Sequence, residues 1–148
     1  MLSRLKIDAA SRALEEAERT RVQMGLLSLA HPGMSLDDAY AVQAAFVERK
    51  IAAGRRRVGW KIGLTSKAMQ QALSIDTPDS GVLLDDMMFD DGATIPAGRF
   101  IQPRIEAELA FVMKAPLKGN GTSVFDVMNA TDYVTPALEI LDTRIVRS

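Results

Sequence analysis

The sequence predicts an α+β fold, with helices in its N-terminal part and mainly strands after them. Up to about residue 53 the chain is rich in Ala, Leu, Glu and Arg, with apolar residues near helical spacing. After Gly54, short segments follow in which apolar and polar residues alternate, separated by clusters of Gly, Pro and Asp. We therefore expect a helical region over residues 1–55 and a β-rich region over residues 56–148.

Length, composition and charge exclude several classes of protein. The 148 residues fit one domain of usual size, and 47% hydrophobic with 25% charged residues is typical of a globular chain. A formal net charge of −1 gives no electrostatic basis for binding nucleic acid or an anionic membrane. The chain has no cysteine, which excludes disulfides and thiolate sites, and no apolar run is long enough to span a bilayer. We expect a cytoplasmic protein with neither nucleic-acid nor membrane partners.

Two helices are predicted before residue 55. The first covers residues 3 to about 24, with Gly25 as its stop. The second begins after Ser35, a cap followed by acids in the first turn, and ends before Gly54. The single histidine, His31, lies beside Pro32-Gly33 and is more typical of a turn than of a ligand or base.

A strand over residues 58–63 places Lys61 between Gly59 and Gly63, on the face opposite the apolar residues. The glycines leave room for a group to approach the lysine amine, although a surface lysine has the same spacing. Residues 67–74 read as a short helix capped near Ser66, and residues 77–81 read as a turn. The methionines and aromatic residues that follow are expected in short extended pieces, as core or lining residues. These are Met87, Met88, Phe89 and Ile95.

The strand over residues 103–112 carries Glu106 and Glu108 on one face and apolar residues on the other. Their backbones would lie roughly 6.5–7 Å apart, so the carboxylates can converge on one point. Converging carboxylates repel unless one takes up a proton or a cation lies between them. A hard divalent ion such as Mg²⁺, which takes oxygen ligands, answers that need. An ordinary solvated strand face is the alternative.

Glu139 is a third acidic residue within an apolar strand, predicted over residues 134–141. Three glutamates from two strands would supply a facial set of oxygen ligands and leave positions for water and substrate. The spacing permits this set without requiring it.

Several separated motifs resemble the hydratase/decarboxylase branch of the fumarylacetoacetate hydrolase superfamily. They are residues 59–66 (GWKIGLTS), 76–83 (DTPDSGVL), 103–108 (PRIEAE) and 129–139 (NATDYVTPALE), in the family's order. The resemblance runs from residue 2 to about residue 144. It implies part of a mixed β-roll after the N-terminal helices. Because relatives are about twice as long, we expect the C-terminal half of that fold to be absent here.

The resemblance also implies the site residues. Glu106, Glu108 and Glu139 match the family's ligands for a divalent metal, Mg²⁺ with Mn²⁺ as a possible substitute. Lys61 matches an active-site lysine suited to moving protons. Asp79 falls where the family has a further acidic residue near the substrate, which could orient the attacking water.

The implied reaction is the addition of water to a carbon–carbon double bond of a 2-oxo-enoate from the catabolism of aromatic compounds. Within the branch, the similarity is greatest to hydratases of a seven-carbon 2-oxo-dicarboxylate in homoprotocatechuate meta-cleavage. A homo-oligomer is expected, with possible association with a decarboxylase.

Three other functions are alternatives to hydration. The 4-oxalocrotonate decarboxylases share the fold and ligand set but release CO₂. Carbon–carbon bond hydrolases of the superfamily rely on a histidine, and His31 lies outside any matching motif. The third is an inactive truncated fragment that acts only in subunit association.

Overall fold

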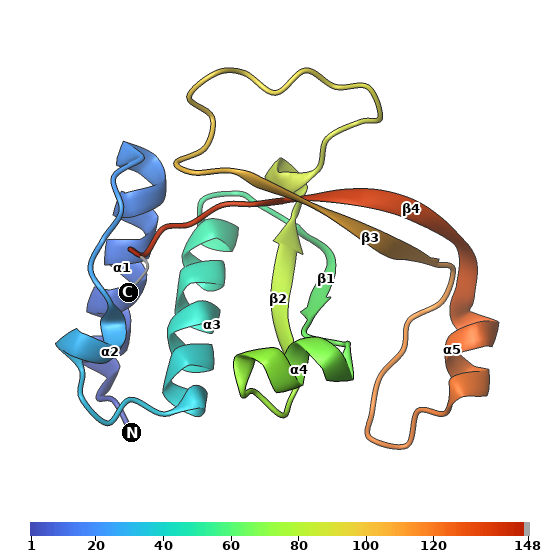
Figure 1. Ribbon diagram of the computed structural model, residues 1–148, viewed down its shortest axis with the longest axis horizontal. Helices are drawn as coiled ribbons and strands as arrows, with labels where there is room; N and C mark the ends of the chain where they lie inside the picture. The colour runs from blue at the N-terminus through green and yellow to red at the C-terminus, as the bar shows by residue number, and fades with distance from the viewer. Residues whose placement is uncertain (147–148) are drawn as a thin grey trace. The chain divides into compact units, whose positions relative to one another are not determined.

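The computed structural model describes residues 1–146 and confirms the α+β class (Figure 1). The chain forms two compact units. One comprises Met1–Arg99 together with the segment that begins at Arg144, and the other comprises Phe100–Thr143. The division predicted from the sequence, a helical region over residues 1–55 and a β-rich region over residues 56–148, describes composition in secondary structure. As a statement about domains it stays a prediction.

The first unit is built on two long helices that lie side by side, α1 (Arg4–Thr20) and α3 (Leu36–Ala52) (Figure 1). A short α2 (Leu27–Ala30) lies between them in the chain. The predicted extension of α1 to residue 24 is wrong, because Arg21 takes the left-handed conformation (φ 58°) and ends the helix. No helix among residues 1–146 is both long and apolar enough to cross a membrane.

The core of the first unit joins α3 to the strand β2 (Asp79–Leu84). Phe46, Val47 and Leu84 are buried together, and partly buried apolar side chains pack around them: Leu14, Ile51, Val82 and Met87. Met88 and Phe89, predicted as core or lining residues, are instead exposed.

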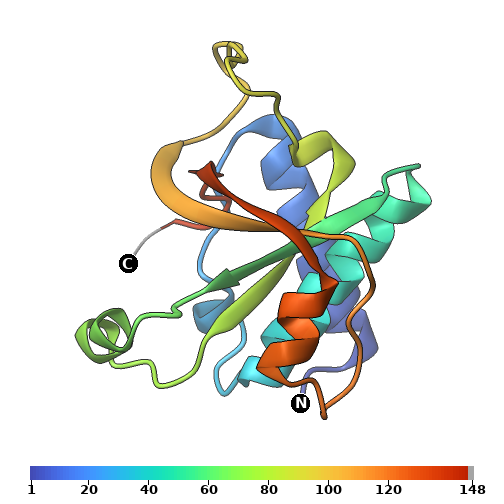
Figure 2. The same ribbon diagram turned by 90° about the vertical axis from the view of Figure 1, so that its right-hand side faces the viewer.

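β1 (Arg57–Gly63) pairs antiparallel with β2, and α4 (Lys67–Leu73) lies where the chain passes from one to the other (Figure 1 and Figure 2). The turn predicted over residues 77–81 is wrong from Asp79 onward, since Asp79 pairs with Gly63 and extends β2. A 3-10 helix, η1 (Asp85–Met87), follows. Residues 88–103 contain no further helix or strand, so the extended pieces expected there are absent.

The three consecutive arginines at the start of β1 are each paired with an acid. Arg55 Nε lies 3.1 Å from Asp86, Arg56 Nε lies 3.2 Å from Asp85, and Arg57 pairs with Glu48. These ion pairs connect the start of β1 to η1 and to α3.

The second unit is an antiparallel ribbon of β3 (Arg104–Met113) and β4 (Thr131–Leu141), joined through α5 (Val124–Ala130). Ser123 caps α5, and its side chain accepts a hydrogen bond from Asp126 N. β4 begins three residues before the predicted start, directly after α5. One face of the ribbon is apolar and exposed, with Ile105, Leu109 and Leu138 among its side chains. The other face carries the glutamates.

Candidate metal centre

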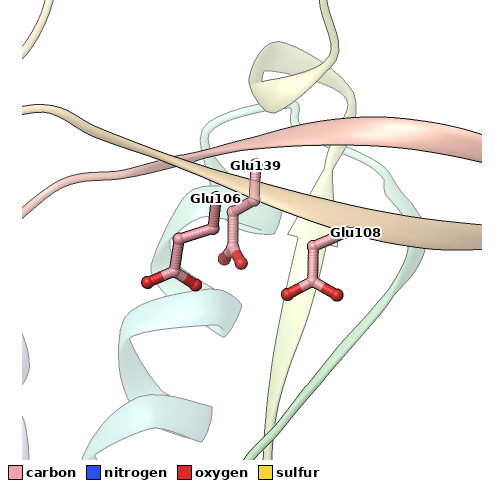
Figure 3. Close-up of side chains that lie close together, drawn as sticks. All are labelled: Glu106, Glu108 and Glu139. Atoms are coloured by element: carbon pink, nitrogen blue, oxygen red, sulfur yellow. The ribbon is translucent and has the colours of Figure 1, made fainter.

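Three carboxylates meet on one face of the β3–β4 ribbon. Each of Glu106, Glu108 and Glu139 offers an oxygen, and these oxygens all lie within 4.8 Å of one another. Figure 3 shows the three side chains leaving the ribbon on the same side, with their carboxylates pointing the same way. The structure therefore brings together the three residues that the sequence singled out from two separate motifs.

Strand alternation and register produce this cluster. Glu106 and Glu108 are two residues apart on β3 and so share a face. Glu139 on β4 lies directly opposite Glu106, and the residue opposite Glu108 is the small Ala137. A side chain of one methyl group puts no bulk against the Glu108 carboxylate.

The donor set fits a hard divalent cation. Glu106 is exposed, whereas Glu108 and Glu139 are partly buried, so the cluster is only partly solvated. In a Mg²⁺ site with bonds of about 2.0–2.1 Å, neighbouring oxygens lie roughly 3 Å apart, which small side-chain rotations would reach here. A cation among the carboxylates would relieve their mutual repulsion. A cation held there would take these three ligands from one face of the ribbon.

Lys61 and Asp79 lie in the first unit, on one face of the β1–β2 pair. Asp79 is opposite Gly63, and Lys61 is opposite Gly81, so the two charged residues are diagonal neighbours. Lys61 is partly buried and Asp79 is exposed. The structure brings the two predicted catalytic residues together in the first unit, whereas the three glutamates belong to the second.

The space above Gly63 is taken by Asp79. A Cβ built on Gly63 would collide with Asp79 Oδ1 and lie 3.2 Å from Asp79 Cγ. At Gly59 the only contact within 4 Å would be an ordinary one of 3.7 Å with Leu83 Cδ1. The glycines around Lys61 were expected to clear its amine, but the room at Gly63 admits the Asp79 carboxylate. This contact was not predicted, because residues 77–81 read as a turn and gave no sign that Asp79 pairs with Gly63.

Two hollows in the surface are lined by other residues. One of about 320 Å³ borders α4 and is lined in part by Gln70 and Ile75. The other, of about 290 Å³, lies in the loop before α5 and includes Lys118 and Asp126. Neither is lined by a predicted site residue, so these hollows do not identify the site.

No family model matches the chain. Individual proteins do. The 2-oxo-hept-4-ene-1,7-dioate hydratase of Escherichia coli is 57% identical over 131 residues, which is 88% of this chain and 49% of the hydratase. The chain thus spans about half the length of this relative.

Solved structures of 4-oxalocrotonate decarboxylase from Pseudomonas putida G7 share the fold. A complex of that enzyme with magnesium and adipate is 39% identical, with a TM-score of 0.92 over 98% of this chain and 55% of the decarboxylase. A complex with calcium and acetate gives the same TM-score of 0.92 and 39% identity, over 98% of this chain and 56% of the other.

Proposed function

We propose that the chain carries the metal centre of a hydratase. It is a homologue of the 2-oxo-enoate hydratases and of 4-oxalocrotonate decarboxylase, and it spans about half their length. The reaction is the addition of water to a 2-oxo-enoate of the 2-oxohept-4-ene-1,7-dioate type, in the catabolism of aromatic compounds. The observation that carries the proposal is the convergence of Glu106, Glu108 and Glu139 on one face of a chain 57% identical to such a hydratase.

Glu106, Glu108 and Glu139 would bind Mg²⁺, with Mn²⁺ as a substitute. When bound, the cation supplies a Lewis acid that stabilises negative charge developing on the substrate's 2-oxo group. The carboxylates contribute ligands from one side only, which leaves room for a small 2-oxo-dicarboxylate and water. The decarboxylase relative, solved with magnesium or calcium, supports a divalent metal.

Lys61 and Asp79 would handle protons and water. Lys61 holds and releases a proton at Nζ, which hydration needs because one alkene carbon gains hydrogen while the other gains oxygen. Asp79 orients the attacking water through a carboxylate oxygen. Their diagonal placement on one face of the β1–β2 pair lets both act on the same bound molecule.

Hydratase activity is favoured over decarboxylation by similarity. The chain is 57% identical to the Escherichia coli hydratase and 39% identical to the solved decarboxylase. Assays of the dienol substrate by absorbance, run beside measurement of CO₂ release, separate the two reactions. Release of CO₂ would assign the chain to the decarboxylases instead.

Metal binding is tested by titrating Mn²⁺ and recording the free ion by electron paramagnetic resonance. We expect one site, and Glu139→Gln should weaken it at least tenfold, since it removes a charged ligand but keeps the shape. Asp132→Asn removes a charge from the same strand, away from the cluster, and should leave affinity unchanged. Equal affinities for Glu139→Gln and the unchanged chain would refute the site.

Turnover is tested in the same preparations with Mg²⁺. Loss of dienol absorbance should depend on Mg²⁺ and fall at least a hundredfold in Lys61→Ala, since acid–base groups contribute about 10²–10⁴-fold. Near-normal turnover in Lys61→Ala would remove that residue from the mechanism. Mn²⁺ binding without turnover would favour a fragment that acts only in subunit association.

A homo-oligomeric state, a cytoplasmic location and association with a decarboxylase complete the proposal. The exposed apolar face of the β3–β4 ribbon supports association. Sedimentation of the purified chain, alone and mixed with a 4-oxalocrotonate decarboxylase, measures both kinds of assembly.

A further inference from the structure

We propose that Asp142 is a positioning residue for the metal centre, because it fixes the strand register that brings Glu106 opposite Glu139. Asp142 directly follows β4, and its carboxylate accepts hydrogen bonds from the chain just before β3. Ile101 N donates to Oδ1 at 3.0 Å and to Oδ2 at 3.1 Å, and Gln102 N donates to Oδ1 at 2.8 Å. One side chain therefore ties the start of β3 to the end of β4.

Register decides whether the glutamates can meet. Arg104 lies opposite Leu141 and Glu106 opposite Glu139. A shift of one residue would turn one strand's carboxylates to the other face. A shift of two would keep the face, but in one direction it would place Glu139 opposite Arg104 and two positions further from Glu108. The observed register places Glu139 directly opposite Glu106 and diagonal to Glu108.

Two features that often set strand register, a tight turn and burial of one face, contribute little in this ribbon. The strands are not joined by a tight hairpin turn, because residues 114–130, which include α5, lie between them. The apolar face of the ribbon is exposed, so burial discriminates weakly between registers. At the far end Lys114 N and Ala115 N donate to Ala130 O at 2.8 and 3.3 Å, beyond the irregularity between Val112 and Met113. The Asp142 contacts lie at the end of the ribbon that carries Glu106 and Glu139.

The inference rests on the proposed metal site, and its test reads metal affinity and backbone protection separately. Asp142→Ala removes the acceptor, whereas Asp142→Asn removes the charge but keeps an oxygen for Ile101 and Gln102. We expect Mn²⁺ affinity to fall about tenfold or more in Asp142→Ala, the scale seen when partners of metal ligands are lost. Asp142→Asn should stay within about threefold of the unchanged chain. Asp132→Ala is the control for removing an acid from β4.

Amide hydrogen exchange supplies a readout that needs no metal. In Asp142→Ala the amides of Ile101 and Gln102 should exchange faster, while those of α3 should not change. Equal losses of Mn²⁺ affinity in Asp142→Ala and Asp142→Asn would show that charge matters rather than register, and would overturn the inference. Unchanged exchange at Ile101 and Gln102 would overturn it too.

The outcomes also separate this inference from the proposed function. If the unchanged chain binds no Mn²⁺, the proposed metal site fails, while exchange at Ile101 and Gln102 still decides whether Asp142 holds the strands. If Asp142→Ala does not fold, as judged by circular dichroism, Asp142→Asn decides. A tenfold loss of affinity with Ile101 and Gln102 still protected, or unchanged affinity with their protection lost, would then overturn the inference.

Discussion

Gly63 is a residue whose missing side chain determines where a charged neighbour lies. A methyl group at this position would occupy the place of the Asp79 carboxylate. In the proposed hydratase, Gly63→Ala should lower kcat about tenfold or more, since a displacement of about 1 Å can cost up to 10²-fold. The ¹³C chemical shift of the Asp79 carboxyl should change as well.

Gly81→Ala is the matched control for this prediction. Gly81 lies on the same face of the same strand pair, opposite Lys61, and nothing lies within 4 Å of the Cβ it would gain. Both kcat and the Asp79 shift should be retained. Parallel losses in the two variants would mean that glycine matters here for the backbone and not for Asp79.

Glu18 is held between two cations in the first unit. Its carboxylate pairs with Lys50 and lies 2.7 Å from Arg144 Nη2, and both cations lie over the ring of Phe46, at 5.6 and 5.3 Å from its centre. Burial raises the pKa of Glu18, but the hydrogen bonds and charges of Lys50 and Arg144 outweigh it, so the pKa lies below its usual value.

A lowered pKa makes the stability of this contact depend on pH. The stabilisation is present above the unfolded pKa of about 4.3 and is lost as pH falls through the lower folded pKa. Glu18→Gln should therefore lower the free energy of unfolding by about 1–2 kcal/mol at pH 7, between the values for surface and buried pairs. Urea unfolding at pH 7 and pH 3 should show the difference shrink at the acid pH.

Glu16→Gln tests whether the position of the pair matters. Glu16 forms an exposed ion pair with Arg19 one turn away on the same helix. Its substitution should change the free energy of unfolding by no more than about 0.5 kcal/mol, the usual range for exposed helix pairs. If Glu18→Gln were equally mild at pH 7, the contact with Arg144 would not stabilise the fold.

At the scale of the element, α3 begins with a reciprocal cap. Ser35 Oγ accepts a hydrogen bond of 3.1 Å from Asp38 N, and Asp38 Oδ2 accepts one of 3.1 Å from Ser35 N. Ser35→Ala should cost about 1 kcal/mol of unfolding free energy, since it leaves a helix-end amide without that partner. Thermal and urea unfolding measure the loss.

Ser66 provides the comparison, because it precedes α4 without making a side-chain hydrogen bond to that helix. Ser66→Ala should change the unfolding free energy by less than about 0.5 kcal/mol. A cost equal to that of Ser35→Ala would mean that serine acts at these positions through something other than the cap.

Local sequence signals predicted the elements whose ends or faces are set by residues close together in the chain. Ser35 and Ser123 each precede an acid by three residues, and both cap a helix in the structure. Alternation placed Glu106 and Glu108 on one face of a strand, since the period of two is a property of the backbone. These features depend on residues only a few positions apart.

Features that depend on residues far apart in the chain could not be predicted from the local sequence. Asp79 belongs to β2 because it pairs with Gly63, although its neighbours have turn composition. The position of Glu139 opposite Glu106 depends on a register that the long connection through α5 does not encode locally. The end of α1 was misjudged because it stops in a left-handed Arg21 and not at the glycine four residues later.

For the molecule as a whole, buried side chains are unevenly shared between the two units. Among the described residues, the buried apolar side chains belong to the first unit, with the exception of Ala130. A two-stranded ribbon with an exposed apolar face has little burial to stabilise it. Amides of β3 and β4 should therefore exchange with solvent faster than those in the middle of α3.

Divalent metal should change this difference selectively. A cation held by Glu106, Glu108 and Glu139 binds the paired ribbon and not the opened one, so it stabilises β3 and β4 by mass action. Mg²⁺ at a hundred times its Kd should slow exchange there about 100-fold, equivalent to about 2.7 kcal/mol, and leave α3 unchanged. In Glu106→Gln/Glu139→Gln the effect should vanish. Equal slowing of exchange in α3, or slowing that survives the double substitution, would show that the metal binds elsewhere. Slowing confined to β3 and β4 would mean that the cation stabilises the same strand register that forms its site.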